Sequence, residues 1–178
     1  INIVQGEYHV SGDPNLAITT LLGSCVAACI SDPHARVGGM NHFMLADSSE
    51  VSPYSASARY GTYAMEILIN HLLKLGARRG NLEAKVFGGG RVMAALSSSN
   101  VGERNCSFVL DFLRTEGILV SAQDLLDVHP RKVYFFPNTG RVLVKKLTRL
   151  HNDTLIRRET EYAARLTEAP VSGDVELF

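Results

Sequence analysis

The chain has 178 residues, of which 46% are hydrophobic and 20% charged, a balance typical of one globular domain with a substantial core. Eighteen Lys and Arg match eighteen Asp and Glu. The zero net charge argues against nucleic acid or an anionic membrane surface as the main partner, because both select a basic protein. We expect no membrane span, no signal peptide and, with three cysteines, no disulfide framework, which favours a reducing cytoplasm.

Alternating apolar and polar residues predict strands near Ile3–Val10, Ala17–Ile30, Val37–Leu45 and Leu82–Phe87. The segment "SDPHAR" lies between the second and third of these, where it predicts the turn of a hairpin. A second hairpin is predicted over residues 131–147, because Pro-Asn-Thr-Gly supplies turn residues between two β-rich runs.

Helical spacing of apolar residues predicts one helix within residues 55–77 and another within 102–117, ending near Gly76 and Gly117. After about Leu150 the pattern becomes a polar helix, followed by a Pro/Ser/Gly breaker and a short tail. Strands and helices in this mixed order predict an α+β fold with mixed β-sheets. We expect one domain over residues 1–150 and a C-terminal helix and tail over 151–178.

Two cysteines and two histidines lie within one apolar, glycine-rich run, at Cys25, Cys29, His34 and His42. A zinc finger needs roughly a dozen residues between its cysteine and histidine pairs, and histidines roughly three to five apart. Here only four residues separate Cys29 from His34, and seven separate the two histidines. The spacing does not favour a metal site, and no cofactor is expected.

The same run also offers a nucleophile and a base. Gly23 allows a tight turn beside Cys25, and backbone N–H groups around Ser24 and Cys25 are suited to bind a developing oxyanion. If "SDPHAR" is a hairpin turn, His42 lies on the strand next to Cys25. The residues alone leave a catalytic pair and a buried structural pair both open, because cysteine is among the most buried residue types.

A third residue is needed to orient the imidazole of a Cys–His pair. On one extended strand Thr19, Gly23 and Cys25 project to one face, whereas Thr20 and Ser24 project to the other. This alternation predicts that Thr19, rather than Thr20, shares a face with Cys25.

Other reactive residues are assigned structural roles. Cys29 continues an apolar run and Cys106 lies in a helix pattern without a neighbouring base, so both are expected in the core. Ser24 lacks the G-x-S-x-G frame of a serine nucleophile. Gly88 and Gly89 belong to "FGGGRVM", which has no phosphate-binding pattern; they are expected to permit close backbone approach, beside the substrate.

Several segments resemble the CheD family of chemoreceptor glutamine deamidases. The resemblance begins with "TTLLGSCVAACISDPHARVGGMNHFML" and continues through "YGTYAMEILINHLLKLGA", "LEAKVFGGG", "VGERNCSFVLDFLRTEGI" and "GRVLVKKL". It covers roughly residues 6–147, and the Gly-Ser-Cys and Gly-Gly-Met-Asn-His elements carry it most specifically.

The resemblance implies hydrolysis of glutamine side chains on chemotaxis receptors, through a Cys-His-Thr triad and a thioester. Carried over by position, the triad is Cys25, His42 and, six positions before the cysteine, Thr19. The implied fold is similar to the CNF-type toxin deamidases, an α/β/β/α sandwich, and the implied partners are receptor cytoplasmic helices and a CheC-type phosphatase. Two alternatives stay open, a non-catalytic adaptor that binds receptors or the phosphatase, and a cysteine hydrolase with another substrate.

Overall fold

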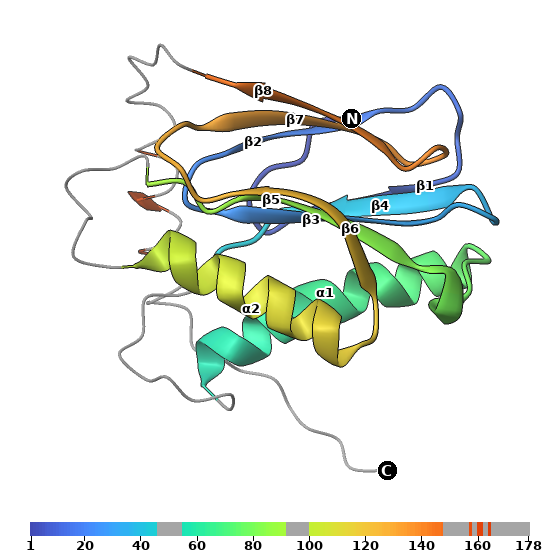
Figure 1. Ribbon diagram of the computed structural model, residues 1–178, viewed down its shortest axis with the longest axis horizontal. Helices are drawn as coiled ribbons and strands as arrows, with labels where there is room; N and C mark the ends of the chain where they lie inside the picture. Colours follow the sequence, from blue (N-terminus) through green and yellow to red (C-terminus); the bar gives the residue numbers. More distant parts are fainter. Residues whose placement is uncertain (46–54, 92–99, 148–156, 158–159, 162–163, 165–178) are drawn as a thin grey trace.

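The computed structural model describes residues 1–45, 55–91 and 100–147, together with residues 157, 160, 161 and 164. Within this part of the chain, two β-sheets lie face to face and two long helices cover the outer face of the larger sheet (Figure 1). The order of layers is helices, five-stranded sheet and three-stranded sheet. The α+β class and the mixed sheets predicted from the sequence are confirmed.

The five-stranded sheet has the order β1-β4-β3-β5-β6, and the three-stranded sheet has the order β2-β7-β8. Only β5 and β6 pair in parallel, joined through a helix, whereas the other neighbours are antiparallel. The strands are β1 (Tyr8–Ser11), β2 (Ile18–Leu22), β3 (Val26–Asp32), β4 (Val37–Asn41), β5 (Glu83–Gly88), β6 (Leu119–Leu125), β7 (Arg131–Phe136) and β8 (Arg141–Lys146).

The helices begin and end close to the predicted residues. In α1 (Ala56–Lys74), the side chain of Ser55 caps the first turn by accepting a hydrogen bond from the Ala58 amide. A short 3-10 helix, η1 (Arg79–Asn81), precedes β5, and α2 (Val101–Thr115) connects β5 to β6. Gly76 and Gly117 follow α1 and α2 with φ of 98° and 67°, as expected of the residues that end helices.

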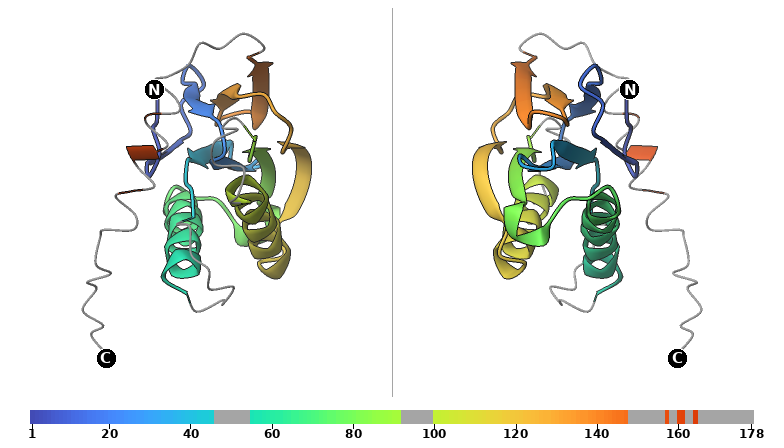
Figure 2. Two further views of the ribbon diagram at one scale, coloured as in Figure 1. Left: turned by 90° about the vertical axis from the view of Figure 1, so that its left-hand side faces the viewer. Right: turned by 90° about the vertical axis from the view of Figure 1, so that its right-hand side faces the viewer.

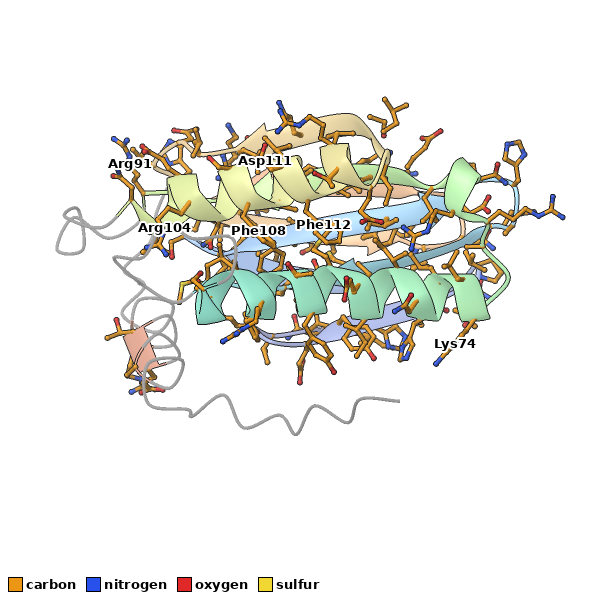
Figure 3. All side chains as sticks on the ribbon, turned by 90° about the horizontal axis from the view of Figure 1, so that it is seen from below. Lys74, Arg91, Arg104, Phe108, Asp111 and Phe112 are labelled. Carbon is orange, nitrogen blue, oxygen red and sulfur yellow. The ribbon has the colours of Figure 1, made fainter. Side chains whose placement is uncertain are left out.

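Two apolar layers hold the sheets and helices together. One lies between the helices and the five-stranded sheet and contains Val26, Phe43 and Leu72; the other lies between the two sheets and contains Ile18, Cys25 and Phe135. Figure 2 shows α1 and α2 side by side beneath the sheets. Figure 3 shows Phe108 and Phe112 of α2 on the side that faces α1. The space between the sheets matters most here, because Cys25 faces it.

Both predicted hairpins are present, as β3–β4 and β7–β8. The single strand predicted over Ala17–Ile30 is wrong, because the backbone bends at residues 23–25 and β2 and β3 belong to different sheets. The strand β6 was not predicted; it is a polar edge strand of the five-stranded sheet, without the alternation of a half-buried strand.

The predicted C-terminal helix lies mostly outside the described residues. The four residues placed there are helical, and Arg157 and Glu161, one turn apart, form an exposed ion pair at 3.6 Å. No helix in the described part of the chain is long and apolar enough to cross a membrane.

Candidate active site

The loop that carries Cys25 connects the two sheets. Residues 23–25 form a bend between β2 and β3, at the left of Figure 1 where one sheet passes into the other. Gly23 and Ser24 are therefore turn residues, as expected, and Cys25 stands directly before the first residue of β3. The Cys25 side chain is fully buried, in the apolar layer between the sheets.

Three consecutive carbonyl groups of this loop each accept a hydrogen bond from a different donor. The Gly90 amide donates to the Gly23 carbonyl at 2.7 Å, and the Gly89 amide donates to the Cys25 carbonyl at 2.8 Å. The side-chain amide of Asn105 donates to the Ser24 carbonyl at 2.9 Å. These bonds fix the peptide planes on either side of the nucleophile candidate.

Gly88 and Gly89 lie against the loop, in agreement with the expected close approach. Gly88 has φ of 114°, and a Cβ atom there would stand 2.1 Å from the Cys25 carbonyl oxygen. Only glycine tolerates both the backbone conformation and the contact. Both glycines lie against the Cys25 carbonyl group, and the Gly89 amide donates to it. The role of the two glycines in binding substrate stays a prediction.

The pairing of β3 with the chain of β4 puts Cys25 and His42 on one face. Cys29 pairs with Met40, and Val26 exchanges two backbone hydrogen bonds with Phe43. Cys25 and His42 each precede one member of that second pair. Because side chains alternate along strands, both project away from the helices, into the layer between the sheets, as diagonal neighbours.

The His42 ring is held by a threonine of the opposite sheet. The Thr20 hydroxyl lies 2.7 Å from His42 Nδ1 and donates its proton to the Ile3 carbonyl at 2.8 Å. Since a hydroxyl has one proton and a carbonyl only accepts, the Thr20 oxygen must accept the N–H of Nδ1. This network assigns the neutral tautomer in which Nε2 carries a lone pair and no proton.

The geometry expected of Thr19 is found at Thr20, which corrects the prediction. Thr19 is half-buried on the outer side of β2, where its hydroxyl lies 3.1 Å from Asn2 Oδ1. The alternation argument assumed one continuous strand from Thr19 to Cys25. The bend at Gly23 breaks that strand, so the count of alternating faces does not carry across it.

Burial sets the charge of the His42 ring. The imidazole is 6% exposed, and loss of hydration lowers the pKa of His42 to about 3, below the ordinary 6.5. The ring is therefore neutral at neutral pH. His42 Nε2 is buried and accepts no hydrogen bond within the described residues, so its lone pair is not engaged there.

The preceding residue, Asn41, fixes the backbone from which His42 projects. Its side-chain oxygen accepts from the Ala28 amide at 2.9 Å, and its side-chain nitrogen donates to the Ala64 carbonyl at 3.0 Å. One amide group thus ties the end of β4 both to β3 and to α1. The "GGMNH" element therefore supplies an anchor as well as the imidazole.

The remaining reactive residues stand apart from this pair. Burial raises the pKa values of both Cys29 and Cys106, so these thiols stay protonated. The Ser24 hydroxyl lies 3.7 Å from the sulfur of Met44. His34 is in the exposed β3–β4 turn. Among the described residues, no three His, Cys, Asp or Glu side chains gather to hold a metal ion.

Three contributors to the site were not identified from the sequence: Thr20, the Ile3 carbonyl and Asn105. Gly23 already indicated a turn. Had the strand been ended there, the alternation of faces would not have been carried through to Cys25, and Thr19 would not have been preferred to Thr20. Ile3 and Asn105 are distant in sequence from Cys25, and no local pattern reports the contacts of either residue.

A family model described as "CheD chemotactic sensory transduction" matches residues 44–146. The curated "Probable chemoreceptor glutamine deamidase CheD 1" of Dechloromonas aromatica is 64% identical over 176 residues, which cover 99% of this chain and 87% of that protein. "Probable chemoreceptor glutamine deamidase CheD" of Janthinobacterium sp. is 64% identical over 178 residues, with the same two shares covered.

A more distant relative, "Probable chemoreceptor glutamine deamidase CheD 1" of Shewanella oneidensis, is 56% identical over 180 residues, which cover all of this chain and 87% of that protein. Among solved structures, the Bacillus licheniformis hypothetical protein YfiH matches with a TM-score of 0.41 at 11% identity, over 68% of this chain and 49% of that chain. The fold assignment rests on the sheets and helices of this chain alone.

Proposed function

This chain belongs to the CheD family of chemotaxis proteins, and we propose that it deamidates glutamine side chains of chemoreceptors with Cys25 as its nucleophile. The names of its relatives supply the class of substrate. The observation that carries the chemistry is the hydrogen-bond chain from the Ile3 carbonyl through Thr20 to His42, because it leaves Nε2 of the imidazole unprotonated on the face shared with Cys25.

In the proposed reaction, His42 Nε2 takes the thiol proton and the Cys25 sulfur attacks the carboxamide carbon of a glutamine. The oxyanion so formed is bound by backbone N–H groups of residues 23–25. His42 then returns its proton to the leaving nitrogen, and the carbon–nitrogen bond breaks to give ammonia and a thioester.

Water completes the cycle. His42 removes a proton from water, the hydroxide adds to the thioester carbon, and the carbon–sulfur bond breaks to release glutamate while the thiolate regains the proton. Thr20 accepts the Nδ1–H throughout and holds the ring in one tautomer. A threonine stabilises the imidazolium less than a carboxylate would, because it carries no charge.

The apolar surroundings suit this chemistry. A dry site strengthens the attraction between a thiolate and an imidazolium, and it removes water that would compete for the oxyanion donors. Because the Cys25 side chain is fully buried, the substrate glutamine must displace the groups that cover the sulfur before it reacts.

The proposal is tested by mass spectrometry of a chemoreceptor cytoplasmic domain incubated with this protein or with its Cys25→Ala variant. We expect a glutamine-to-glutamate mass gain that requires Cys25, and intact peptide bonds. Binding without any mass change would instead support the adaptor, and cleavage of peptide bonds would support a protease. Cys25→Ala removes one sulfur atom, so circular dichroism is expected to show the same fold.

A further inference from the structure

Asn105 of α2 connects the two chain segments that carry the proposed nucleophile and base. Its side chain is fully buried. The side-chain oxygen accepts from the Leu45 amide at 2.8 Å, and the side-chain nitrogen donates to the Ser24 carbonyl at 2.9 Å. Ser24 precedes Cys25 by one residue and Leu45 follows His42 by three. A single amide group therefore bridges both segments.

This bridge requires a side chain with both a hydrogen-bond acceptor and a hydrogen-bond donor. One end must accept from a backbone N–H while the other donates to a backbone carbonyl; the bond to Leu45 is buried and the bond to Ser24 is partly buried. Among short uncharged side chains, only asparagine carries its donor and its acceptor on two separate atoms, as the two partners here require. Leucine supplies neither group, and aspartate supplies the acceptor alone.

The other two anchors of the nucleophile loop come from the backbone of residues 89 and 90. Asn105 differs from them because it also reaches the segment of His42. The Asn105 side chain contacts both segments, whereas each backbone anchor contacts the loop alone. Through this side chain, α2 is bonded to the chain segments of both Cys25 and His42.

We propose that Asn105 is a positioning residue, whose side-chain amide holds the Cys25 loop and the His42 segment at the separation that proton transfer requires. This inference rests on the proposed function of the pair. Asn105 does not contact the reacting atoms; it acts through the peptide groups of Ser24 and Leu45. Misplacement of reacting groups by about 1 Å is sufficient to slow an enzyme by roughly 100-fold.

The test compares Asn105→Ala and Asn105→Asp with Val109→Ala, a matched control one turn along the same helix. Val109 is fully buried in the layer between helices and sheet and its apolar side chain makes no hydrogen bond, so its truncation weakens packing without removing a hydrogen bond to either segment. We expect the Asn105 variants to lose roughly 10- to 100-fold in kcat with KM within about 2-fold. Val109→Ala is expected to keep the wild-type kcat.

A second readout is independent of the receptor substrate. The rate of Cys25 alkylation by iodoacetamide, measured by mass spectrometry from pH 6 to pH 10 (about the range over which thiols titrate), reports the thiol and its neighbouring base. We expect the profile to shift in both Asn105 variants and to match the wild type in Val109→Ala. Each variant is assayed at a temperature at which circular dichroism shows it folded.

If Asn105→Ala does not fold, Asn105→Asp carries the test, because it keeps the acceptor for Leu45 and puts a carboxyl oxygen in place of the donor to Ser24. Folded Asn105 variants with wild-type kcat and wild-type alkylation profiles would overturn the inference. A failure of the proposed function looks different: the wild-type protein would produce no Cys25-dependent deamidation, whatever the alkylation profiles of the Asn105 variants.

Discussion

At the scale of single residues, the two adjacent threonines of β2 have opposite environments. Thr20 is buried between the sheets, with its hydroxyl on His42, whereas Thr19 is half-buried and bonded to the N-terminal segment. The two side chains are chemically identical, so the face of β2 from which each projects determines which one reaches the imidazole. The sequence could propose Cys25 and His42 as a pair, but the choice of threonine depended on a bend of three residues, at positions 23–25.

Replacing Thr20 by valine, which has the same shape but no hydroxyl, is expected to lower kcat by about 100-fold, because the Nδ1–H loses its acceptor and the tautomer is no longer fixed. Thr20→Ser should retain most activity. The matched control is Thr19→Val, which should leave kcat within about 2-fold of the wild type. Ammonia release from a receptor domain gives kcat. A loss in Thr19→Val with none in Thr20→Val would contradict the assignment.

The buried imidazole makes stability depend on pH. The unfolded chain binds a proton at His42 below pH 6.5, whereas the folded chain, whose His42 pKa is about 3, does not. Stability contributed by the neutral ring is complete above pH 6.5 and is lost as the pH falls toward 3. The free energy of unfolding should fall by about 1.4 kcal/mol per pH unit more steeply than in His42→Gln. Urea titrations at several pH values check this; parallel curves would refute it.

At the scale of elements, the end of β5 determines where the nucleophile loop rests. Gly88 closes β5 with its backbone against the Cys25 carbonyl, and the next two residues donate to the same loop. The glycine-rich pattern indicated a close backbone approach, and the structure identifies the backbone that it approaches. The glycines indicate that another group comes close, but they do not identify that group, because the Cys25 carbonyl belongs to a distant part of the sequence.

Gly88→Ala is expected to destabilise the protein by about 2 kcal/mol or more and to reduce kcat, because a Cβ atom is strained at this φ and collides with the Cys25 carbonyl. Gly80→Ala is the control, since a Cβ atom there meets nothing within 4 Å. It should be neutral or stabilising by about 0.5 kcal/mol. Urea unfolding measures both, and equal effects at the two glycines would count against this account.

The success of element prediction followed the strength of local signals. Both hairpins and both long helices carry turn residues, caps or sustained periodicity, and these lie where they were expected. The strand β6 was missed because it is an exposed edge strand, whose formation depends on pairing with β5 rather than on an apolar pattern of its own. The prediction of one strand over β2 and β3 failed because the apolar residues continue through the bend that separates them.

At the scale of the whole molecule, Arg131 joins the two sheets, because it belongs to one sheet and pairs with Asp124 of the other. It is the first residue of β7 in the three-stranded sheet, its side chain is fully buried, and its guanidinium pairs with Asp124 of β6 at 2.9 Å. The same guanidinium donates to the carbonyls of Leu126 and His129. The hydrogen bond from Arg131 also lowers the pKa of Asp124.

Arg131→Met should therefore cost about 2 kcal/mol in the free energy of unfolding, because it removes the buried partner of a half-buried ion pair and leaves two carbonyls without their donor. The comparison is Arg114→Met, which breaks an ion pair with Asp111 whose side chains are 80% and 63% exposed. That change should stay within about 0.5 kcal/mol of the wild type. Thermal and urea unfolding distinguish the two; similar stabilities would show that Arg131 does not join the sheets energetically.

The complete site is a property of the whole fold. The thiol comes from the join of β2 and β3, the imidazole from the end of β4, the hydroxyl from the opposite sheet and the amide bridge from α2. The sequence could indicate the proposed nucleophile and base because Cys25 and His42 lie in one short run. Thr20 and Asn105 needed the packing of two sheets and a helix, which no local spacing encodes.

The central claim is that Cys25 forms a thioester with the glutamine side chain, and trapping with hydroxylamine tests it most directly. A receptor domain is incubated with the wild-type protein or Cys25→Ala in the presence of hydroxylamine and examined by mass spectrometry. We predict hydroxamate at the glutamines that the wild-type protein otherwise converts to glutamate, and neither product with Cys25→Ala. Glutamate formed by the Cys25→Ala variant, or by the wild type without hydroxamate, would contradict the claim.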